Sequence, residues 1–216
     1  MAYRAVLFDL DGTLLDTLQD IADSVNIALA QLGFPQHEVE AYKYFVGDGR
    51  VALATRALPK DCRDQLSVDR LSASIEIEYS KRWANNTRAY DGIPNMLQSL
   101  ADLGIKMAIL SNKPQDSTEE TVSRLLSHWR FEIVLGAQPS IPMKPDPTSA
   151  LQIARRLNIP PAEFLYLGDT DVDMKTAAAA GMYPVGALWG FRTADELLAG
   201  GARELIQYPT DLLRLL

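Results

Sequence analysis

Short apolar runs alternate with amphipathic segments along most of this 216-residue chain. The apolar runs are typical of strands buried on both faces, and they lie at residues 5–8, 106–110, 131–135, 164–167 and 183–187. Apolar residues at helical spacing predict helices at 93–103, 117–126, 147–157 and 172–180. Strands that alternate with such helices indicate a parallel sheet covered on both faces. The predicted fold class is therefore α/β, with a Rossmann-like parallel sheet core.

One long segment lacks any strand pattern. Residues 16–88 carry helical periodicity and predict helices at 17–32, 38–45, 50–58 and 61–85. We therefore expect an all-helical domain at 16–88, inserted into a core domain formed by 1–15 and 89–216. The tail, 193–216, predicts two short helices around an edge segment near Leu205.

Composition narrows the expected partners and compartment. The formal net charge of −7 disfavours nucleic acid or an anionic membrane surface as a partner. The single cysteine, Cys62, excludes an internal disulfide, and two histidines leave little room for histidine-based zinc or triad chemistry. No signal peptide or transmembrane pattern precedes the first strand, so we expect a cytoplasmic protein. We also expect a chain that is monomeric or homodimeric.

Two carboxylates follow the first predicted strand. Asp9 and Asp11 are two residues apart, so along an extended backbone they would project to the same side, and Gly12 then permits a tight turn. Two carboxylates about 4 Å apart, at an effective dielectric of about 20, repel by about 4 kcal/mol. A divalent cation would offset that repulsion. Helix capping is the alternative explanation, and for an isolated Asp-x-Asp it is the better one.

Three further polar motifs follow the next predicted strands of the core. Ser111 and Asn112 follow the second strand, where the Ser111 hydroxyl suits a phosphate oxygen. Lys144 follows the third strand, in a proline-rich stretch that cannot be helical, and offers a fixed positive charge. Asp169 and Asp173 follow the fourth strand, and their spacing lets Asp173 face the same pocket from the first helical turn. Taken singly, these residues fit helix caps and a surface lysine equally well.

The motifs carry more weight together, because ligands of open α/β sheets bind outside the carboxyl ends of the strands. Successive strands would end in Asp-x-Asp, Ser, Lys and Asp. Such a site has carboxylates for a hard cation, and a serine and a lysine for an anion. Mg²⁺ with a phosphoryl group satisfies both halves, and a carboxylate beside the metal can act as a nucleophile toward phosphorus.

With these residues in this order, the chain resembles the haloacid dehalogenase-like hydrolase superfamily, in particular its phosphoglycolate phosphatase-like branch. The segments that match its four motifs are Asp9-x-Asp11-x-Thr13, Ser111-Asn112, Lys144-Pro145 and Gly168-Asp169-x-x-x-Asp173. The resemblance covers essentially the whole chain, and the helical insert at 16–88 corresponds to the cap domain of that family.

The resemblance implies a Mg²⁺-dependent phosphatase acting on a small phosphorylated metabolite, which is the expected partner molecule, with 2-phosphoglycolate as a candidate. Asp9 would attack phosphorus and form an aspartyl-phosphate, and Asp11 would serve as general acid and then general base. The Asp9 side chain, the Asp11 backbone carbonyl and Asp169 would bind the metal.

The remaining motif residues also receive roles from the resemblance. Ser111, Asn112 and Lys144 would bind the phosphoryl oxygens. Thr13 would steady the loop of the nucleophile, and Asp173 would orient metal-bound water or Lys144.

Substrate choice and the exact reaction stay open at this point. Gly47, Gly49 and Arg50 resemble a substrate-contacting loop of the cap, although a glycine-rich turn with a solvent-facing arginine fits about as well. A sugar phosphomutase of the β-phosphoglucomutase kind and an inorganic pyrophosphatase can share every motif. A receiver domain phosphorylated on aspartate is a remoter alternative, since the insert at 16–88 argues against it, and a catalytically silent binding protein is another.

Overall fold

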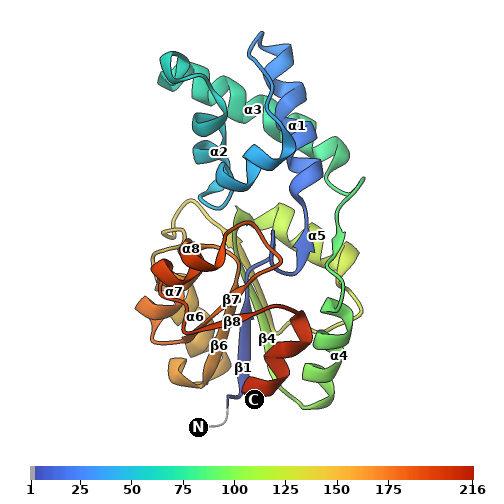
Figure 1. Ribbon diagram of the computed structural model, residues 1–216, viewed down its shortest axis with the longest axis vertical. Helices are drawn as coiled ribbons and strands as arrows, with labels where there is room; N and C mark the ends of the chain where they lie inside the picture. Colours follow the sequence, from blue (N-terminus) through green and yellow to red (C-terminus); the bar gives the residue numbers. More distant parts are fainter. Residues whose placement is uncertain (1–2) are drawn as a thin grey trace. The chain divides into compact units, whose positions relative to one another are not determined.

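A computed structural model describes residues 3–216 of the chain (Figure 1). The chain forms two compact units. We call them the α/β unit, which comprises Met1–Leu15 and Ala89–Leu216, and the helical unit, which comprises Asp16–Arg88. None of the helices among the described residues combines the length and the apolar character that crossing a membrane requires.

The α/β unit is built on a six-stranded sheet in which every neighbouring pair is parallel, in the order β5-β4-β1-β6-β7-β8. The strands are β1 (Ala5–Phe8), β4 (Lys106–Pro114), β5 (Ile133–Ala137), β6 (Phe164–Gly168), β7 (Tyr183–Ala187) and β8 (Glu204–Ile206). Phe8, at the end of β1, is in register with Ile109 of β4 and Leu167 of β6. The residues that follow Phe8 and Leu167 therefore emerge at one edge of the sheet.

Each face of this sheet buries its own apolar core. Along β1, Val6 and Phe8 belong to one core, and Ala5 and Leu7 belong to the other, as the two-residue period of a strand requires. The first core is covered by α4 (Ile93–Asp102), α5 (Gln115–Leu125) and the 3₁₀ helix η4 (Pro209–Leu215). The second is covered by α6 (Thr148–Leu157) and α7 (Asp171–Ala180), with the 3₁₀ turn η3 (Pro161–Glu163) leading into β6.

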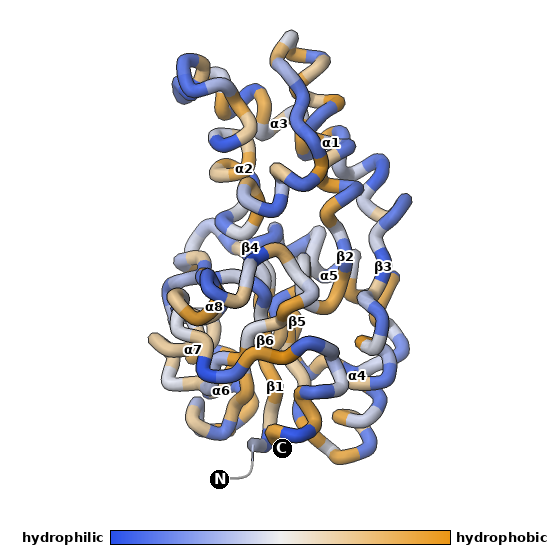
Figure 2. Tube along the Cα trace, in the orientation of Figure 1, coloured by the Kyte–Doolittle hydropathy of each residue, from blue (hydrophilic) through white to orange (hydrophobic). Residues whose placement is uncertain are grey.

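In Figure 2 the trace of β1 is coloured mainly as apolar, whereas the surrounding helices carry both apolar and polar residues. The short helix α8 (Ala194–Gly200) and η4 flank β8 at the edge of the sheet, as the tail pattern predicts. The predicted α/β fold, a parallel sheet with helices on both faces, is confirmed.

The helical unit consists of α1 (Leu18–Gln31), η1 (Val39–Tyr44), α2 (Gly49–Ala57), η2 (Lys60–Cys62) and α3 (Gln65–Arg82). Both α1 and α2 pack against α3. The helix predicted at 61–85 is wrong at its start, because the Asp64 side chain accepts a hydrogen bond from the Ser67 N–H at 3.1 Å and begins α3 there. The segment predicted as a helix at 38–45 is a 3₁₀ helix.

A buried carboxylate, Asp20, connects the first and last segments of the helical unit by hydrogen bonds. Asp20, in the first turn of α1 and 1% exposed, accepts hydrogen bonds from the Asn86 and Thr87 backbone N–H groups at 2.8–3.0 Å. The Asn86 side-chain amide and the Thr87 hydroxyl donate to it as well, each at 2.8 Å. Asp20 thereby ties the segment that leaves the unit to the helix that begins it.

The hydropathy pattern does not predict two features of the strands. The strands β2 (Leu15–Asp16) and β3 (Arg88–Ala89) pair with each other, and two residues are too few to show a period. The strand predicted at 106–110 continues to Pro114, with a shift in register after Leu110. Polar residues from Ser111 onward hide this extension, because they end the apolar run although pairing with β5 resumes at Pro114.

Candidate active site

Asp9 lies directly after β1, and its backbone N–H donates to Leu167 C=O of β6 at 2.9 Å. The turn that follows is tight: Gly12 has φ of +87°, and a Cβ at this position would collide with the Asp169 carboxylate. Thr13, fully buried, donates from Oγ1 to Asp169 Oδ1 at 2.8 Å. Glycine and threonine thus let the loop after β1 approach the end of β6, and they bring Asp9 and Asp169 to the same place.

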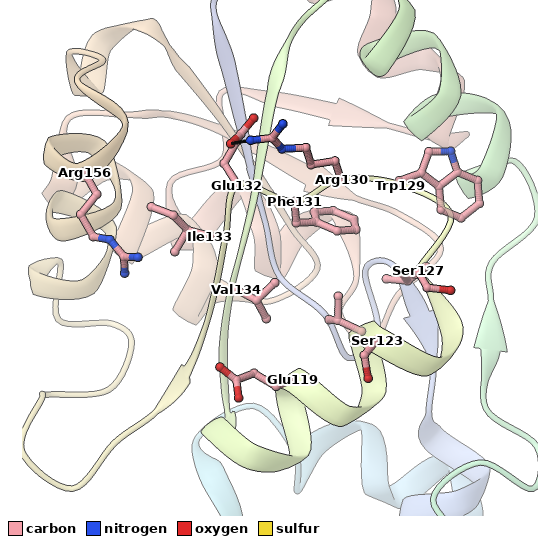
Figure 3. Close-up of a pocket in the computed structure, with 12 residues that line it drawn as sticks. Glu119, Ser123, Ser127, Trp129, Arg130, Phe131, Glu132, Ile133, Val134 and Arg156 are labelled. Carbon is pink, nitrogen blue, oxygen red and sulfur yellow. Dashed lines mark hydrogen bonds and ion pairs between the residues drawn. The ribbon is translucent and has the colours of Figure 1, made fainter.

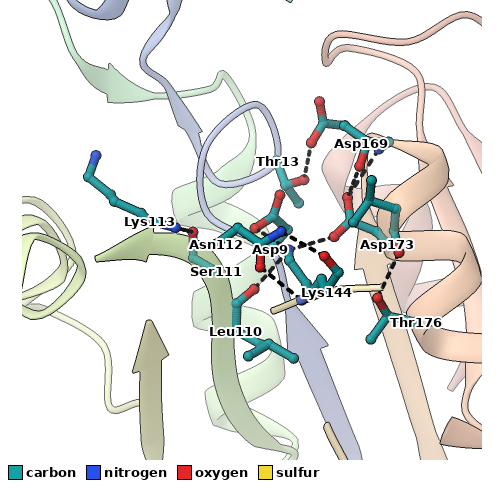
Figure 4. Close-up of polar contacts among 12 residues, drawn as sticks. Asp9, Thr13, Leu110, Ser111, Asn112, Lys113, Lys144, Asp169, Asp173 and Thr176 are labelled. Atoms are coloured by element: carbon teal, nitrogen blue, oxygen red, sulfur yellow. Dashed lines mark hydrogen bonds and ion pairs between the residues drawn. The ribbon is translucent and has the colours of Figure 1, made fainter. Parts of the chain in front are cut away.

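Lys144 joins this group from the loop after β5. Its Nζ donates to Asp9 Oδ1 and to Asp173 Oδ1, both at 2.7 Å, and to Leu110 C=O at 3.1 Å (Figure 4). Three acceptors account for the three hydrogens of the ammonium. The Lys144 side chain is 3% exposed, so its charge is fixed in position by contacts with protein groups alone.

The Asn112 side chain holds the Lys144 backbone. Asn112 Nδ2 donates to Lys144 C=O at 3.0 Å, and Lys144 N–H donates to Asn112 Oδ1 at 2.9 Å. The prediction places Asn112 among the phosphate ligands, but its side-chain amide is engaged with Lys144. A phosphate contact by the Asn112 backbone, and one by the neighbouring Ser111 hydroxyl, stay predictions.

Three carboxylates form the acidic half of the site. Single oxygen atoms of Asp9, Asp169 and Asp173 all lie within 4.8 Å of one another, and all three residues are buried. Asp169 is oriented by Thr13 and by the Phe191 N–H, which donates to Oδ2 at 2.8 Å. Asp173 accepts from the Thr170 N–H at 3.1 Å and from its hydroxyl at 2.7 Å, in a capping box at the start of α7.

The charges of this cluster are unbalanced, since one ammonium faces three carboxylates. Burial and the neighbouring Asp173 raise the pKa of Asp9 well above its ordinary value, and Lys144 only partly offsets this. Burial and Asp173 also raise the pKa of Asp169 to about 7. Burial alone would lower the pKa of Lys144, but Asp173 and Asp9 outweigh it and raise that pKa well above the ordinary value. A further positive charge would stabilise all three carboxylates in their ionised form, so the donor set fits a hard divalent cation.

Comparison with known proteins identifies the family at this point. The family model of the haloacid dehalogenase-like hydrolases matches residues 6–187. The chain belongs to this family. A phosphoglycolate phosphatase of Xanthomonas campestris pv. campestris is 32% identical over 210 residues, which cover 97% of this chain and 94% of that protein. One of Aquifex aeolicus is 29% identical over 99% of this chain and 96% of its own length.

Solved structures agree with this assignment. The structure of a putative phosphoglycolate phosphatase from Lactobacillus delbrueckii subsp. bulgaricus is similar, with a TM-score of 0.93 and 28% identity, over 100% of this chain and 98% of that one. A putative haloacid dehalogenase-like hydrolase from Bacteroides fragilis has a TM-score of 0.89 and 27% identity, over 97% and 99% of the two chains. The chain is a haloacid dehalogenase-like hydrolase and, by its relatives, a phosphatase.

The structure of this hydrolase separates the two carboxylates of the first motif. Asp9 contacts Lys144, whereas Asp11 Oδ1 lies 3.3 Å from the Lys113 ammonium. Because β1 ends at Phe8, the two-residue period of a strand does not extend to Asp11. Within the part of the chain that the structure describes, the carboxylate cluster contains Asp173, and not the Asp11 side chain, beside Asp9 and Asp169.

Sequence reasoning missed Lys113, whose side chain is only 6% exposed. It also missed Tyr166, a fully buried residue of β6 whose hydroxyl lies 3.5 Å from Asp173 Oδ1. The signal for Lys113 was its position directly after Ser111 and Asn112. The tyrosine carried none, because an aromatic residue in a buried strand is ordinary core.

The predicted specificity residues lie in the helical unit of the hydrolase. Gly47 and Gly49 have positive φ, +113° and +83°, and Arg50 lies in the first turn of α2. The Arg50 guanidinium pairs with Glu76 of α3 at 2.9 Å, with its side chain 33% exposed. A structural partner therefore accounts for Arg50 within its own unit, and a contact with substrate stays a prediction.

An open groove of about 540 Å³ borders α5 and β5 of the hydrolase (Figure 3). Phe131 in its wall packs edge-on against Phe8, with ring centroids 6.5 Å apart. Two of its acidic residues have partners: Glu132 pairs with Lys106 and Arg130, and Glu119 accepts from the Gln115 amide. This groove contains none of the predicted site residues.

Proposed function

We propose that this hydrolase is a Mg²⁺-dependent phosphatase that hydrolyses a small phosphorylated metabolite, 2-phosphoglycolate, through an aspartyl-phosphate on Asp9. The observation that carries the proposal is the contact of one buried ammonium, Lys144, with both Asp9 and Asp173. A carboxylate held by a fixed positive charge in a buried, acid-rich site suits attack on a phosphoryl group. The substrate is taken from the names of the relatives.

Asp9 and Asp11 would divide the chemistry. Lys144 contacts Asp9 Oδ1, and the other carboxylate oxygen, Oδ2, would attack phosphorus. As the bond from Asp9 to phosphorus forms, the ester P–O bond breaks and the leaving oxygen takes a proton from Asp11. Water then attacks the phosphoryl group and gives a proton to Asp11, while the bond to Asp9 breaks and inorganic phosphate is released.

The carboxylates of Asp9 and Asp169, with the Asp11 backbone carbonyl implied by the family resemblance, are the residues that would hold Mg²⁺, and Asp173 beside them would orient metal-bound water or Lys144. A bound Mg²⁺ supplies the positive charge that lets an anionic phosphoryl group approach an anionic nucleophile. Thr13 holds the ligand Asp169 in place, and Thr170 holds the supporting Asp173, so both carboxylates are oriented in advance.

The helical unit, 16–88, is proposed to be the cap that governs substrate choice. Gly47, Gly49 and Arg50 are its candidate contacts with the non-phosphate end of the substrate. The ion pair of Arg50 with Glu76 offers a direct comparison. Arg50→Ala raises KM if the arginine contacts substrate, and Glu76→Ala leaves KM unchanged, because it removes the pair but keeps the guanidinium.

The primary experiment measures phosphate release from 2-phosphoglycolate, pyrophosphate and hexose phosphates with Mg²⁺. The expected result is release from 2-phosphoglycolate that Asp9→Asn lowers about a thousandfold or more. Asp171→Asn is the matched control, since Asp171 pairs with Lys175 at 2.6 Å outside the cluster. Unchanged turnover in Asp9→Asn would overturn the nucleophile assignment, and isomerised sugar phosphate without free phosphate would indicate a mutase.

A further inference from the structure

Lys113 is a second lysine beside the motif carboxylates, and the roles described above do not use it. Its Nζ lies 3.3 Å from Asp11 Oδ1. In Figure 4 the Lys113 side chain extends away from the cluster around Lys144. The two ammonium groups therefore serve different carboxylates: Lys144 contacts the proposed nucleophile, and Lys113 contacts the proposed acid.

The backbone around Lys113 is fixed. Its N–H donates to Ser111 Oγ at 3.2 Å, and its C=O accepts from the Thr118 hydroxyl at 3.1 Å. The residue lies in β4, near the end of the strand, and its side chain is 6% exposed. Lysines on protein surfaces are normally solvated and mobile, so a lysine held in this way is a pre-positioned charge.

We propose that Lys113 binds an anionic group on the carbon next to the ester oxygen of the substrate, and so selects phosphomonoesters of 2-hydroxy carboxylates. This inference rests on the proposed function, because it takes Asp11 as the acid that protonates the leaving oxygen. An acid must come within about 3 Å of the oxygen that it protonates. Lys113, which contacts that acid, therefore lies on the side of the organic group and not on the side of the phosphoryl oxygens.

The dimensions of such a substrate fit this position. In a 2-phosphooxy carboxylate one carbon separates the ester oxygen from the carboxylate carbon, so the carboxylate oxygens lie about 3 Å from the ester oxygen. Lys144 is not an alternative partner, because Asp9, Asp173 and Leu110 already accept from its ammonium. Lys113 is instead placed beside the proposed acid by its contact with Asp11.

The experiment compares two substrates of nearly equal size, 2-phosphoglycolate and 2-hydroxyethyl phosphate, which differ in the carboxylate. The quantity measured is the ratio of their kcat/KM values in the wild type, in Lys113→Met and in Lys113→Arg. A ratio within one variant does not depend on how much of the protein is folded. We expect Lys113→Met to lower the ratio about tenfold or more, because it removes a charge-assisted contact, and Lys113→Arg to restore much of it. Lys175→Met, which removes an exposed lysine paired with Asp171, leaves the ratio unchanged.

Each other result has a distinct meaning. If Lys113→Met lowers kcat/KM equally for both substrates, or leaves both values unchanged, Lys113 does not bind the carboxylate of the substrate. The inference is then overturned, while the phosphatase proposal stands. If the wild type cleaves neither ester, the proposed function fails, and the inference fails with it.

Discussion

Asn112 and Lys144 lie 32 residues apart in the sequence and are joined by two hydrogen bonds between one side chain and one backbone. The end of β4 thereby holds the loop that carries the buried ammonium. Since Lys144 in turn contacts Asp9 and Asp173, a single amide side chain determines where the positive charge of the site lies.

Replacing this amide tests its role. Asn112→Ala removes both hydrogen bonds, and at about 1 kcal/mol for each we expect a loss of about 2 kcal/mol in the free energy of unfolding, with kcat reduced. Urea denaturation and steady-state kinetics measure the two effects. Asn95→Ala, at an exposed position of α4, is the control. A raised KM with unchanged stability would show instead that Asn112 acts as a phosphate ligand alone.

Much of the fold could be predicted because its signals are local. The apolar run at Ala5–Phe8 coincides with β1, and Gly181 and Gly201 end α7 and α8 in the left-handed conformation that suits glycine. The continuation of β4 to Pro114 could not be predicted, since the residues that follow Leu110 are polar and pairing with β5 resumes only at Pro114. Backbone pairing depends on a neighbouring strand, and the hydropathy of a single segment does not indicate it.

The site was predictable as a set of motifs, but not as a set of contacts. The ends of parallel strands meet at one edge, so the meeting of Asp9, Lys144 and Asp169 follows from topology. Which carboxylate pairs with which lysine depends on turns a few residues long. The hydrogen bonds of the Asn112 side chain to Lys144 and the pairing of Lys113 with Asp11 depend on such short turns, and no periodic pattern in the sequence indicates them.

Loss of the buried ammonium is expected to be costly. Lys144→Met leaves Asp9 and Asp173 without their shared counter-charge, and breaking a buried ion pair from one side destabilises by about 3–5 kcal/mol. We expect a lower melting temperature and no measurable phosphate release. Lys106→Met removes a lysine whose side chain is 53% exposed and paired with Glu132, and it has little effect on either measurement. A Lys144→Met protein as stable as the wild type would contradict this expectation, because it would show that Asp9 and Asp173 do not need the lysine as a counter-charge.

Metal binding has a readout that does not require turnover. A ligand that binds only the folded state at ten times its Kd stabilises it by about 1.4 kcal/mol, so Mg²⁺ is expected to raise the melting temperature of the wild type. Asp169→Asn removes one of the three clustered carboxylates and is expected to reduce this increase strongly. In Asp171→Asn the increase is retained, because Asp171 is outside the cluster. Equal increases in all three proteins would place the metal elsewhere.

The Asp20 carboxylate gives the helical unit a stability that depends on pH. Burial alone would raise the pKa of Asp20, but hydrogen bonds from Asn86 and Thr87 outweigh burial and lower it. A group whose pKa is lower in the folded state stabilises that state above its unfolded pKa of about 3.9, and the contribution is lost as the pH falls through the folded value. Asp20→Asn is therefore expected to destabilise the protein by about 1–3 kcal/mol at pH 7.

The difference between wild type and Asp20→Asn should shrink as the pH falls from about 4 toward the lowered pKa of folded Asp20, because the carboxyl of the unfolded wild type takes up its proton first. Denaturant titrations at a series of pH values measure this difference directly. Asp69→Asn is the matched control, because Asp69 is an exposed carboxylate of α3 that accepts from the Gln65 amide at 2.8 Å. A difference that stays constant from pH 7 to pH 3 would mean that the shape of the Asp20 side chain, and not its charge, holds Asn86 and Thr87.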